Sequence, residues 1–239
     1  MSVSYPQKER YSVDDLVEIL ALLRSPEGCP WDREQTHESI RSNMLEEACE
    51  AIEAINQHDA EHLKEELGDV LFQVVFHAQM AAEAGTFTLE DVADGICKKM
   101  LARHPHVFGN VAAADAGEAL GAGDAGKRQT STNQAQADLL QNVPRSLPAL
   151  MRAEKVQRRA ARGGYDRADL SEVLADFKAT VETLENAVQT GATDTASLGR
   201  MLFATVALAR RMGWDAEQAL TDETDAFITQ FREWEQKQS

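Results

Sequence analysis

The chain has 239 residues, enough for one large domain or two small ones with a substantial core. A hydrophobic content of 43% and a mean hydropathy of −0.40 indicate a soluble globular protein. The 40 acidic residues outnumber the 24 basic ones and give a formal net charge of −16. Because contacts to phosphate groups need basic patches, we expect neither a nucleic acid nor an anionic membrane as partner. Three cysteines without metal-ligand spacing, and the lack of a signal pattern, favour a cytoplasmic location.

Helical periodicity dominates the chain, and no alternating strand pattern of useful length occurs. The first helix is predicted to start near Ser12, with Asp15 completing a capping box, and to end near Arg24. A loop is predicted over 25–32. Further helices are predicted over 38–57, 59–84, 88–103, 147–162, 169–189, 194–212 and 215–236. The sequence therefore predicts an all-α protein.

Two acidic couplets, Glu47 with Glu50 and Glu66 with Asp69, stand in consecutive predicted helices. A spacing of three residues places both carboxylates of a couplet on one helix face. Helical phase puts them at the borders of two apolar stripes, formed by Met44, Leu45, Ala48, Ala51, Ile52 and Ile55 and by Leu63, Leu67, Val70, Leu71, Val74 and Ala78. Four carboxylates brought together repel one another unless a cation lies among them, and Mg²⁺ or Mn²⁺ prefers such oxygen ligands. The simpler interpretation is that each couplet neighbours Lys or Arg.

The two halves of the chain share an internal repeat, because the pattern of residues 67–78 recurs at 198–209. The second copy has Ser197 and Arg200 in the places of Glu66 and Asp69. Helical phase likewise places Thr180 and Thr183 opposite the first couplet. We expect a first module over 1–110 that carries the acidic metal site, a flexible linker over 111–140, and a second module over 141–239 with degenerate acids.

Five segments together resemble the MazG nucleoside triphosphate pyrophosphohydrolases of the two-repeat type. They are residues 28–32 (GCPWD), 35–37 (QTH), 45–50 (LEEACE), 66–69 (ELGD) and 103–109 (RHPHVFG), with 144–155 resembling the second repeat. The resemblance implies tandem all-α helical-bundle modules, a homodimer and a house-cleaning hydrolase that converts a nucleoside triphosphate to the monophosphate and pyrophosphate with Mg²⁺. The acidic signature of the family maps onto Glu46, Glu47, Glu50, Glu66 and Asp69.

Cleavage between the α- and β-phosphates requires neutralising a polyphosphate and activating a water molecule, and carboxylate-bound metal ions do both. We expect the metal ligands to be Glu47, Glu50, Glu66 and Asp69. The catalytic residues expected are Glu46, Glu47 and Asp69, with Glu46 either a ligand or the base that orients the water. Substrate contacts are expected from Trp31, Lys98, Lys99, Arg103, Lys155 and Arg158.

Three alternatives stay open from the residues alone. A di-iron carboxylate protein needs Glu-x-x-His pairs, and such spacing occurs at Glu34 and His37. A non-catalytic helical dimer would use both modules for partner binding. A phosphoribosyl-ATP or dUTP pyrophosphohydrolase would share the chemistry and differ in substrate. Base preference, the number of metal ions and any sharing of the site between subunits are not specified by the motifs.

Overall fold

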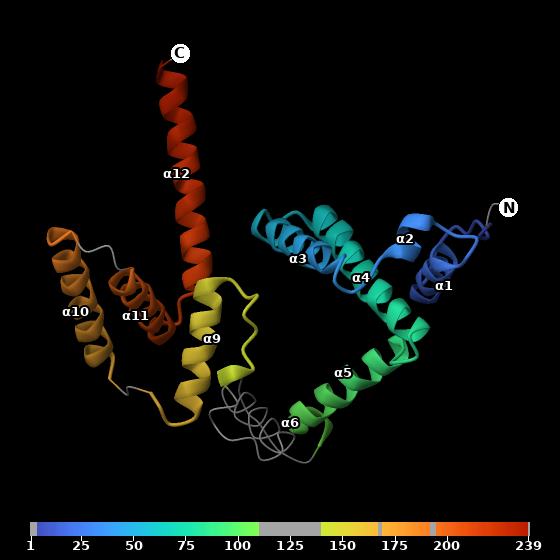
Figure 1. Ribbon diagram of the computed structural model, residues 1–239, viewed down its shortest axis with the longest axis horizontal. Helices are drawn as coiled ribbons and strands as arrows, with labels where there is room; N and C mark the ends of the chain where they lie inside the picture. Colours follow the sequence, from blue (N-terminus) through green and yellow to red (C-terminus); the bar gives the residue numbers. More distant parts are fainter. Residues whose placement is uncertain (1–3, 110–139, 167–168, 192–194, 239) are drawn as a thin grey trace. The chain divides into compact units, whose positions relative to one another are not determined.

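The computed structural model describes residues 4–109, 140–166, 169–191 and 195–238, and all of its regular elements are helices (Figure 1). The all-α prediction is confirmed. The chain forms two compact units, Met1–Thr130 and Ser131–Ser239. The predicted linker over 111–140 lies outside the described residues except for its last position.

Unit 1 contains six described helices. They are α1 (Val13–Arg24), α2 (Pro30–Glu34), α3 (Arg41–Asn56), α4 (Ala60–Glu83), α5 (Leu89–Arg103) and α6 (Pro105–Phe108). The bounds of α1, α3, α4 and α5 follow the predicted ones closely, whereas α2 and α6 were not predicted. The short helix α2 corrects the predicted loop over 25–32. Pro30 begins this helix because proline at the first position has a suitable φ and lacks only an N–H that would be unpaired there.

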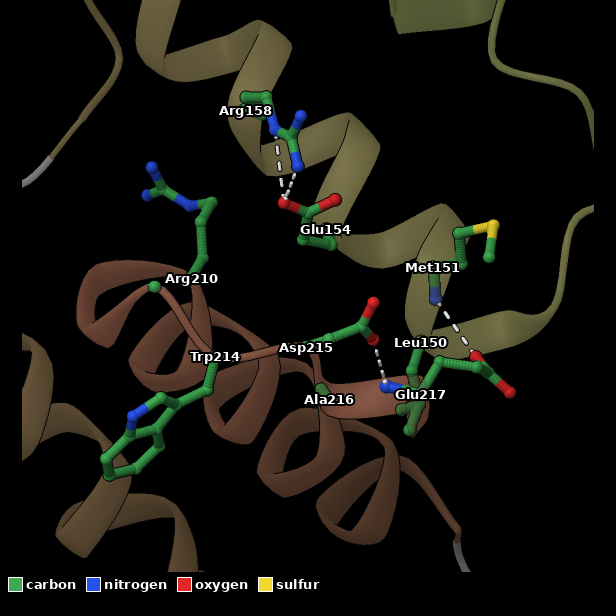
Figure 2. A pocket seen from close by; sticks show the side chains of 10 residues that line it. Leu150, Met151, Glu154, Arg158, Arg210, Trp214, Asp215, Ala216 and Glu217 are labelled. Atoms are coloured by element: carbon green, nitrogen blue, oxygen red, sulfur yellow. Dashed lines mark hydrogen bonds and ion pairs between the residues drawn. The ribbon is translucent and has the colours of Figure 1, made fainter. Parts of the chain in front are cut away.

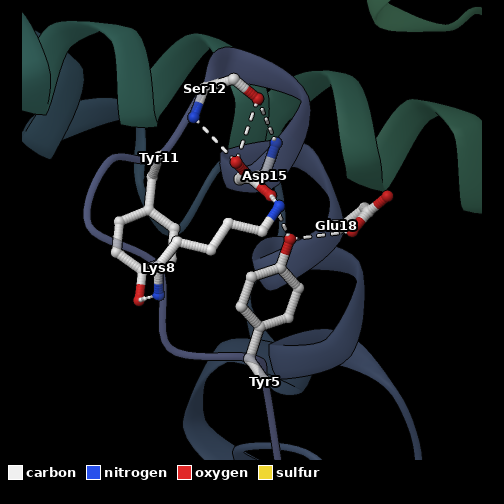
Figure 3. A network of polar contacts seen from close by, with 6 residues as sticks. All are labelled: Tyr5, Lys8, Tyr11, Ser12, Asp15 and Glu18. Carbon is white, nitrogen blue, oxygen red and sulfur yellow. Dashed lines mark hydrogen bonds and ion pairs between the residues drawn. The ribbon is translucent and has the colours of Figure 1, made fainter.

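A network of polar contacts fixes the start of α1, as the capping signal predicts (Figure 3). The Ser12 hydroxyl accepts from the Asp15 amide at 3.2 Å, and the Asp15 carboxylate accepts from the Ser12 amide at 2.8 Å. The Tyr5 hydroxyl donates to Asp15 at 2.6 Å and to Glu18 at 2.8 Å, while Lys8 forms an ion pair with Asp15. Lys8 first, followed by Tyr5 and the Ser12 amide, lowers the pKa of Asp15. The hydrogen bond to Asp15 first, then burial and the bond to Glu18, raise the pKa of Tyr5. The segment before α1 is thereby attached to the helix.

The two halves of α4 have different partners. Val75, Phe76 and Met80 in its second half pack with Leu20 of α1 and Ile40 to form the hydrophobic core of the unit. The first half of α4 packs against α3, and the buried side chains there include a carboxylate rather than a leucine. The core thus holds one end of α4 rigidly, while the other end carries the polar groups.

The apolar stripes predicted for α3 and α4 are only partly buried, which corrects the expectation. Ala51, Ala54 and Ala78 are buried, but the large members Leu45, Ile52, Ile55, Leu67 and Leu71 are between 37% and 57% exposed. The small alanines allow the two helices to approach closely, and the large side chains point away from the pair. A described apolar face of unit 1 therefore lacks a covering element within this unit.

Unit 2 contains α9 (Ala149–Arg162), α10 (Leu170–Gln189), α11 (Ala196–Met212) and α12 (Ala216–Gln238). Helices α10 and α11 form a pair, and α9 and α12 both contact α11 (Figure 1). No residue of α12 is buried, although Phe227, Phe231 and Trp234 lie on it. None of the described helices is both long and apolar enough to cross a lipid bilayer.

Candidate metal centre

Helices α3 and α4 bring three of the predicted acids together. One ligand oxygen from each of Glu47, Glu66 and Asp69 can be chosen so that all three lie within 4.8 Å of one another. Glu66 is only 8% exposed, Glu47 is half-buried and Asp69 is open to solvent. The three carboxylates thus form a cluster that is closed on the protein side and accessible from outside, as a site for a cation and a soluble substrate requires.

The cluster is electrostatically unfavourable without a cation. Burial first, and then the negative charges of Asp69 and Glu50, raise the pKa of Glu47. His62, one turn before Glu66 on α4, places its Nε2 at 2.9 Å from Glu66 Oε1. Among the described residues of unit 1, no lysine or arginine forms an ion pair with any of the three carboxylates. The simpler interpretation, in which the acids neighbour basic side chains, does not account for this cluster.

The donor set fits a hard divalent cation. All three groups offer carboxylate oxygens, the ligands that Mg²⁺ and Mn²⁺ prefer. Glu50 is exposed and lies outside the group of three, yet it is close enough to contribute to the pKa shift of Glu47. Glu46 is also exposed and contributes less to that shift.

The predicted substrate-binding residues of unit 1 do not form ion pairs with the cluster. Lys98 pairs with Asp94 on its own helix at 2.5 Å, and Lys99 is exposed on the same helix. Arg103 is half-buried near the end of α5, and its Nε atom is buried without a hydrogen-bond partner. Trp31 is 58% exposed on α2. Of these four, Trp31 and Lys99 are exposed without a partner that would hold them, and Arg103 has a buried Nε atom without a hydrogen-bond partner.

Lys155 and Arg158 both lie on α9 of unit 2, where Arg158 forms an ion pair with Glu154. Arg158 also lines a cavity of about 530 Å³ beside Arg210 and Trp214 (Figure 2). The charged groups around this cavity already have partners within the unit. Arg210 pairs with Asp166 at 2.8 Å, and Glu217 accepts a hydrogen bond from the Met151 amide at 3.1 Å.

The positions in unit 2 that the repeat aligns with the acids hold no carboxylate. The hydroxyls of Thr180 and Thr183 donate to carbonyl oxygens of their own helix, both at 2.7 Å. Ser197 is buried and Arg200 is exposed. Within the part of the chain that the structure describes, the carboxylate cluster of unit 1 is the one group of three or more ligands suited to a metal ion.

Two polar contacts of α4, His62 with Glu66 and His77 with His37, were not predicted from the sequence, although His37 belongs to the QTH segment and to the Glu34–His37 spacing. His62 could have been found, because its i,i+4 spacing from Glu66 places both on one helix face. His37 and His77 form a stacked pair with their Nδ1 atoms 2.7 Å apart, and burial followed by the charge of His37 lowers the pKa of His77. This contact joins a loop to α4 across 40 residues, so no local pattern could reveal it. The cluster contains no histidine, which gives the di-iron alternative no support.

The fold and the site define an all-α protein in which two consecutive helices carry a cluster of carboxylates that could hold a metal ion. A sequence profile of the MazG nucleotide pyrophosphohydrolase domain matches residues 35–108, which include the whole cluster. A nucleoside triphosphate pyrophosphohydrolase of Escherichia coli K12 is 42% identical over 93% of this chain and 87% of its own length. The nucleoside triphosphate pyrophosphohydrolase/pyrophosphatase MazG of Thermotoga maritima is 39% identical over 93% of this chain and 85% of its own length. The chain belongs to the MazG family of nucleoside triphosphate pyrophosphohydrolases, as the motif resemblance predicts.

Proposed function

We propose that the protein hydrolyses nucleoside triphosphates to the monophosphate and pyrophosphate, using Mg²⁺ held by unit 1. The observation that carries the proposal is the cluster of Glu47, Glu66 and Asp69, which lies within the segment that the family profile matches. Relatives that cover most of the chain have the same activity in their names. Mn²⁺ is the expected substitute, because it prefers the same oxygen ligands.

The residues of the cluster divide the chemistry among them. Glu47, Glu66 and Asp69 hold the cation, and Glu50 joins them as a fourth carboxylate. When bound, the cation neutralises phosphate charge and lowers the pKa of a water molecule. Glu46 would serve either as a further ligand or as the base that takes a proton from the attacking water; the water oxygen bonds to the α-phosphorus, the bond from that phosphorus to the bridging oxygen breaks, and pyrophosphate leaves. His62, 2.9 Å from Glu66, orients that carboxylate.

The test is pyrophosphate release from a panel of ribo- and deoxynucleoside triphosphates, with Mg²⁺ and with EDTA. The panel includes dUTP and phosphoribosyl-ATP, so that the related pyrophosphohydrolases are outcomes of the same experiment. We expect release that depends on Mg²⁺ and is abolished by EDTA. No release from any nucleotide would contradict the proposal and favour the non-catalytic interaction protein.

We further propose that the active form is a homodimer. Leu45, Ile52, Ile55 and Leu67 are each about half exposed on the α3–α4 pair, and no residue of α5 is buried although Val92, Ile96 and Leu101 lie on it. Exposed apolar surface on two neighbouring elements is typical of a protein–protein interface. A second copy offers an identical apolar face, which is the self-complementary surface that a two-fold dimer needs.

We propose that unit 2 is a duplicated module that serves as a scaffold. Its α10–α11 pair corresponds to α3–α4, and hydroxyls or a guanidinium replace the carboxylates at the matching positions. The alternative, a second active site, is not supported by any group of three or more potential metal ligands in the described residues of this unit.

We also propose a cytoplasmic location. Cys29, Cys49 and Cys97 are unpaired thiols, which supports a reducing environment.

A further inference from the structure

A row of polar side chains lies along the side of α4 that faces α3. Glu66 and Asp69 mark this side because they meet Glu47 of α3, and His77, further along α4, contacts His37 in the loop that precedes α3. At 100° per residue, Gln73 falls between the directions of Glu66 and Asp69. Gln73 therefore lies in the same row, one helical turn beyond the metal cluster and one turn before the histidine pair.

Gln73 is the member of this row with an unmet hydrogen-bonding requirement. Gln73 is only 4% exposed, and its Oε1 atom is buried without a hydrogen-bond partner. Its neighbours in the row have partners, since Glu66 pairs with His62 and His77 contacts His37. Buried acceptors in native proteins are nearly always paired, so an unpaired one beside a candidate site indicates a missing donor.

The position of Gln73 fits the part of the substrate that follows the phosphates. Four residues separate it from Asp69 and eight separate His77 from Asp69, which correspond to ~6 Å and ~12 Å along the helix axis. A nucleotide whose phosphates occupy the carboxylate cluster has to extend its ribose and base away from the cation. Gln73 is the next residue of the row after the cluster, so a nucleoside that extends along this side of α4 would meet its amide first.

We propose that Gln73 Oε1 accepts a hydrogen bond from the nucleoside part of the substrate, either from an N–H of the base or from an O–H of the ribose. This inference rests on the proposed pyrophosphohydrolase activity. Amide side chains of this kind read base edges in other contexts, because every base presents N–H groups or acceptors in a fixed pattern. The stacked pair of His37 and His77 lies at the end of the row that is farther from the carboxylate cluster.

The test compares Gln73→Met, which keeps the length of the side chain and removes the amide, with the wild-type protein. Gln79→Met is the matched control, since Gln79 lies on the same helix and donates to Glu83 instead. We expect Gln73→Met to raise KM by roughly tenfold while kcat changes less than about twofold, because the bond exists in both ground and transition states. The Mg²⁺ concentration for half-maximal rate should stay unchanged, because the cation ligands remain.

The nucleotide panel separates the two possible donors. If the donor is an N–H of the base, the increase in KM differs between nucleotides with different bases. If it is the ribose 2′-hydroxyl, the increase is present for ribonucleotides and absent for the corresponding deoxynucleotides; if it is the 3′-hydroxyl, the increase is the same for every nucleotide of the panel. An unchanged KM for every nucleotide would overturn the proposal, and so would an increase that Gln79→Met shares.

Thermal unfolding distinguishes a binding role from a structural one. Removing an unpaired buried acceptor should leave the Tm of Gln73→Met equal to or above that of the wild type. A lowered Tm together with a lowered kcat would assign Gln73 to folding and overturn the proposal. If the wild-type protein itself shows no turnover, the proposed function fails, and calorimetric binding of an α,β-methylene triphosphate then decides about Gln73. Weaker binding by Gln73→Met supports the inference, and equal binding refutes it.

Discussion

Glu66 and Leu67 are adjacent in the chain, yet the carboxylate is 8% exposed and the leucine is 54% exposed. This is the reverse of the usual arrangement, in which a charged residue is almost never buried without a partner. Two separate requirements explain it. Glu66 is turned inward to meet Glu47 and His62, and Leu67 is turned outward to a surface that we propose a second copy covers.

Replacing Leu67 with Lys should therefore convert the dimer into a monomer. A charge in the middle of an apolar interface has to be desolvated without compensation, which costs several kcal/mol in the association free energy, roughly a thousandfold or more in Kd. Sedimentation equilibrium of the full chain gives the mass directly. Glu65→Lys, at an exposed position on the same helix, is the control for charge alone and should stay dimeric. A monomeric wild-type protein would contradict the dimer.

Asp69→Asn should lower kcat of the Mg²⁺-dependent reaction by at least about 100-fold. Its circular dichroism spectrum should stay that of the helical wild-type protein. The amide keeps the shape of the side chain but loses the negative charge that a cation ligand provides. Because one of the repelling charges is gone, the cation-free variant should unfold at the same or a higher temperature. Glu65→Gln, outside the cluster, should have wild-type kinetics. Near-normal activity of Asp69→Asn would refute the assigned ligand.

The stability of the cation-free protein should depend on the protonation of Glu47. Its pKa in the folded state is above the ordinary value of 4.5, mainly because of burial and of Asp69. The folded state therefore binds more protons than the unfolded state between these two values, so this group lowers the free energy of unfolding as the pH rises through that window. We expect Glu47→Gln to raise the Tm above the window in EDTA and to have no such effect below it.

Mg²⁺ should reverse the pH dependence of stability that Glu47 causes in the cation-free protein. A cation binds the charged cluster, so adding Mg²⁺ should raise the Tm of the wild-type protein at pH 8 much more than at pH 4. Glu47→Gln should show a much smaller increase at either pH. A Tm that Mg²⁺ does not change at pH 8, in the same differential scanning measurement, would argue against a metal centre in unit 1.

The ion pair between Arg24 of α1 and Glu83 of α4 gives a second pH dependence of opposite sign. The two groups are 2.8 Å apart, and the Arg24 guanidinium first, with the Gln79 amide, lowers the pKa of Glu83. The stabilisation is present above the ordinary pKa and is lost as the pH falls through the lowered one. We expect Glu83→Gln to lower the free energy of unfolding by about 1 kcal/mol at pH 7, a value kept small because the Glu83 side chain is 39% exposed.

Urea unfolding at pH 7 and at about pH 3, below the ordinary glutamate pKa, measures this difference. The difference between Glu83→Gln and the wild type should shrink at the lower pH. Glu61→Gln is the comparison, since Glu61 is 85% exposed and pairs with Lys64 on the surface, where an ion pair contributes little. An effect of Glu83→Gln that is the same at both pH values would assign it to packing.

Much of the local structure could be read from short stretches of sequence. The capping pairs Ser12 with Asp15 and Thr88 with Asp91 mark the starts of α1 and α5, since a cap depends on residues three positions apart. The spacing of the couplets likewise places Glu66 and Asp69 on one face of a single helix. Pro30 begins α2, and its preference for the first position of a helix was a local signal that the prediction of a loop over 25–32 overlooked.

What the sequence by itself determined is therefore the helical class, most helix bounds and the carboxylates available to a cation. Only the tertiary structure decided that Glu47 meets Glu66 and Asp69 while Glu50 stays at the edge, and that Gln73 is buried with an unpaired oxygen. Helical phase describes each helix in isolation, so it treats the larger apolar stripe as the buried face. The close packing of α3 on α4 through alanines reversed that choice, because contact between two helices depends on the side chains of both.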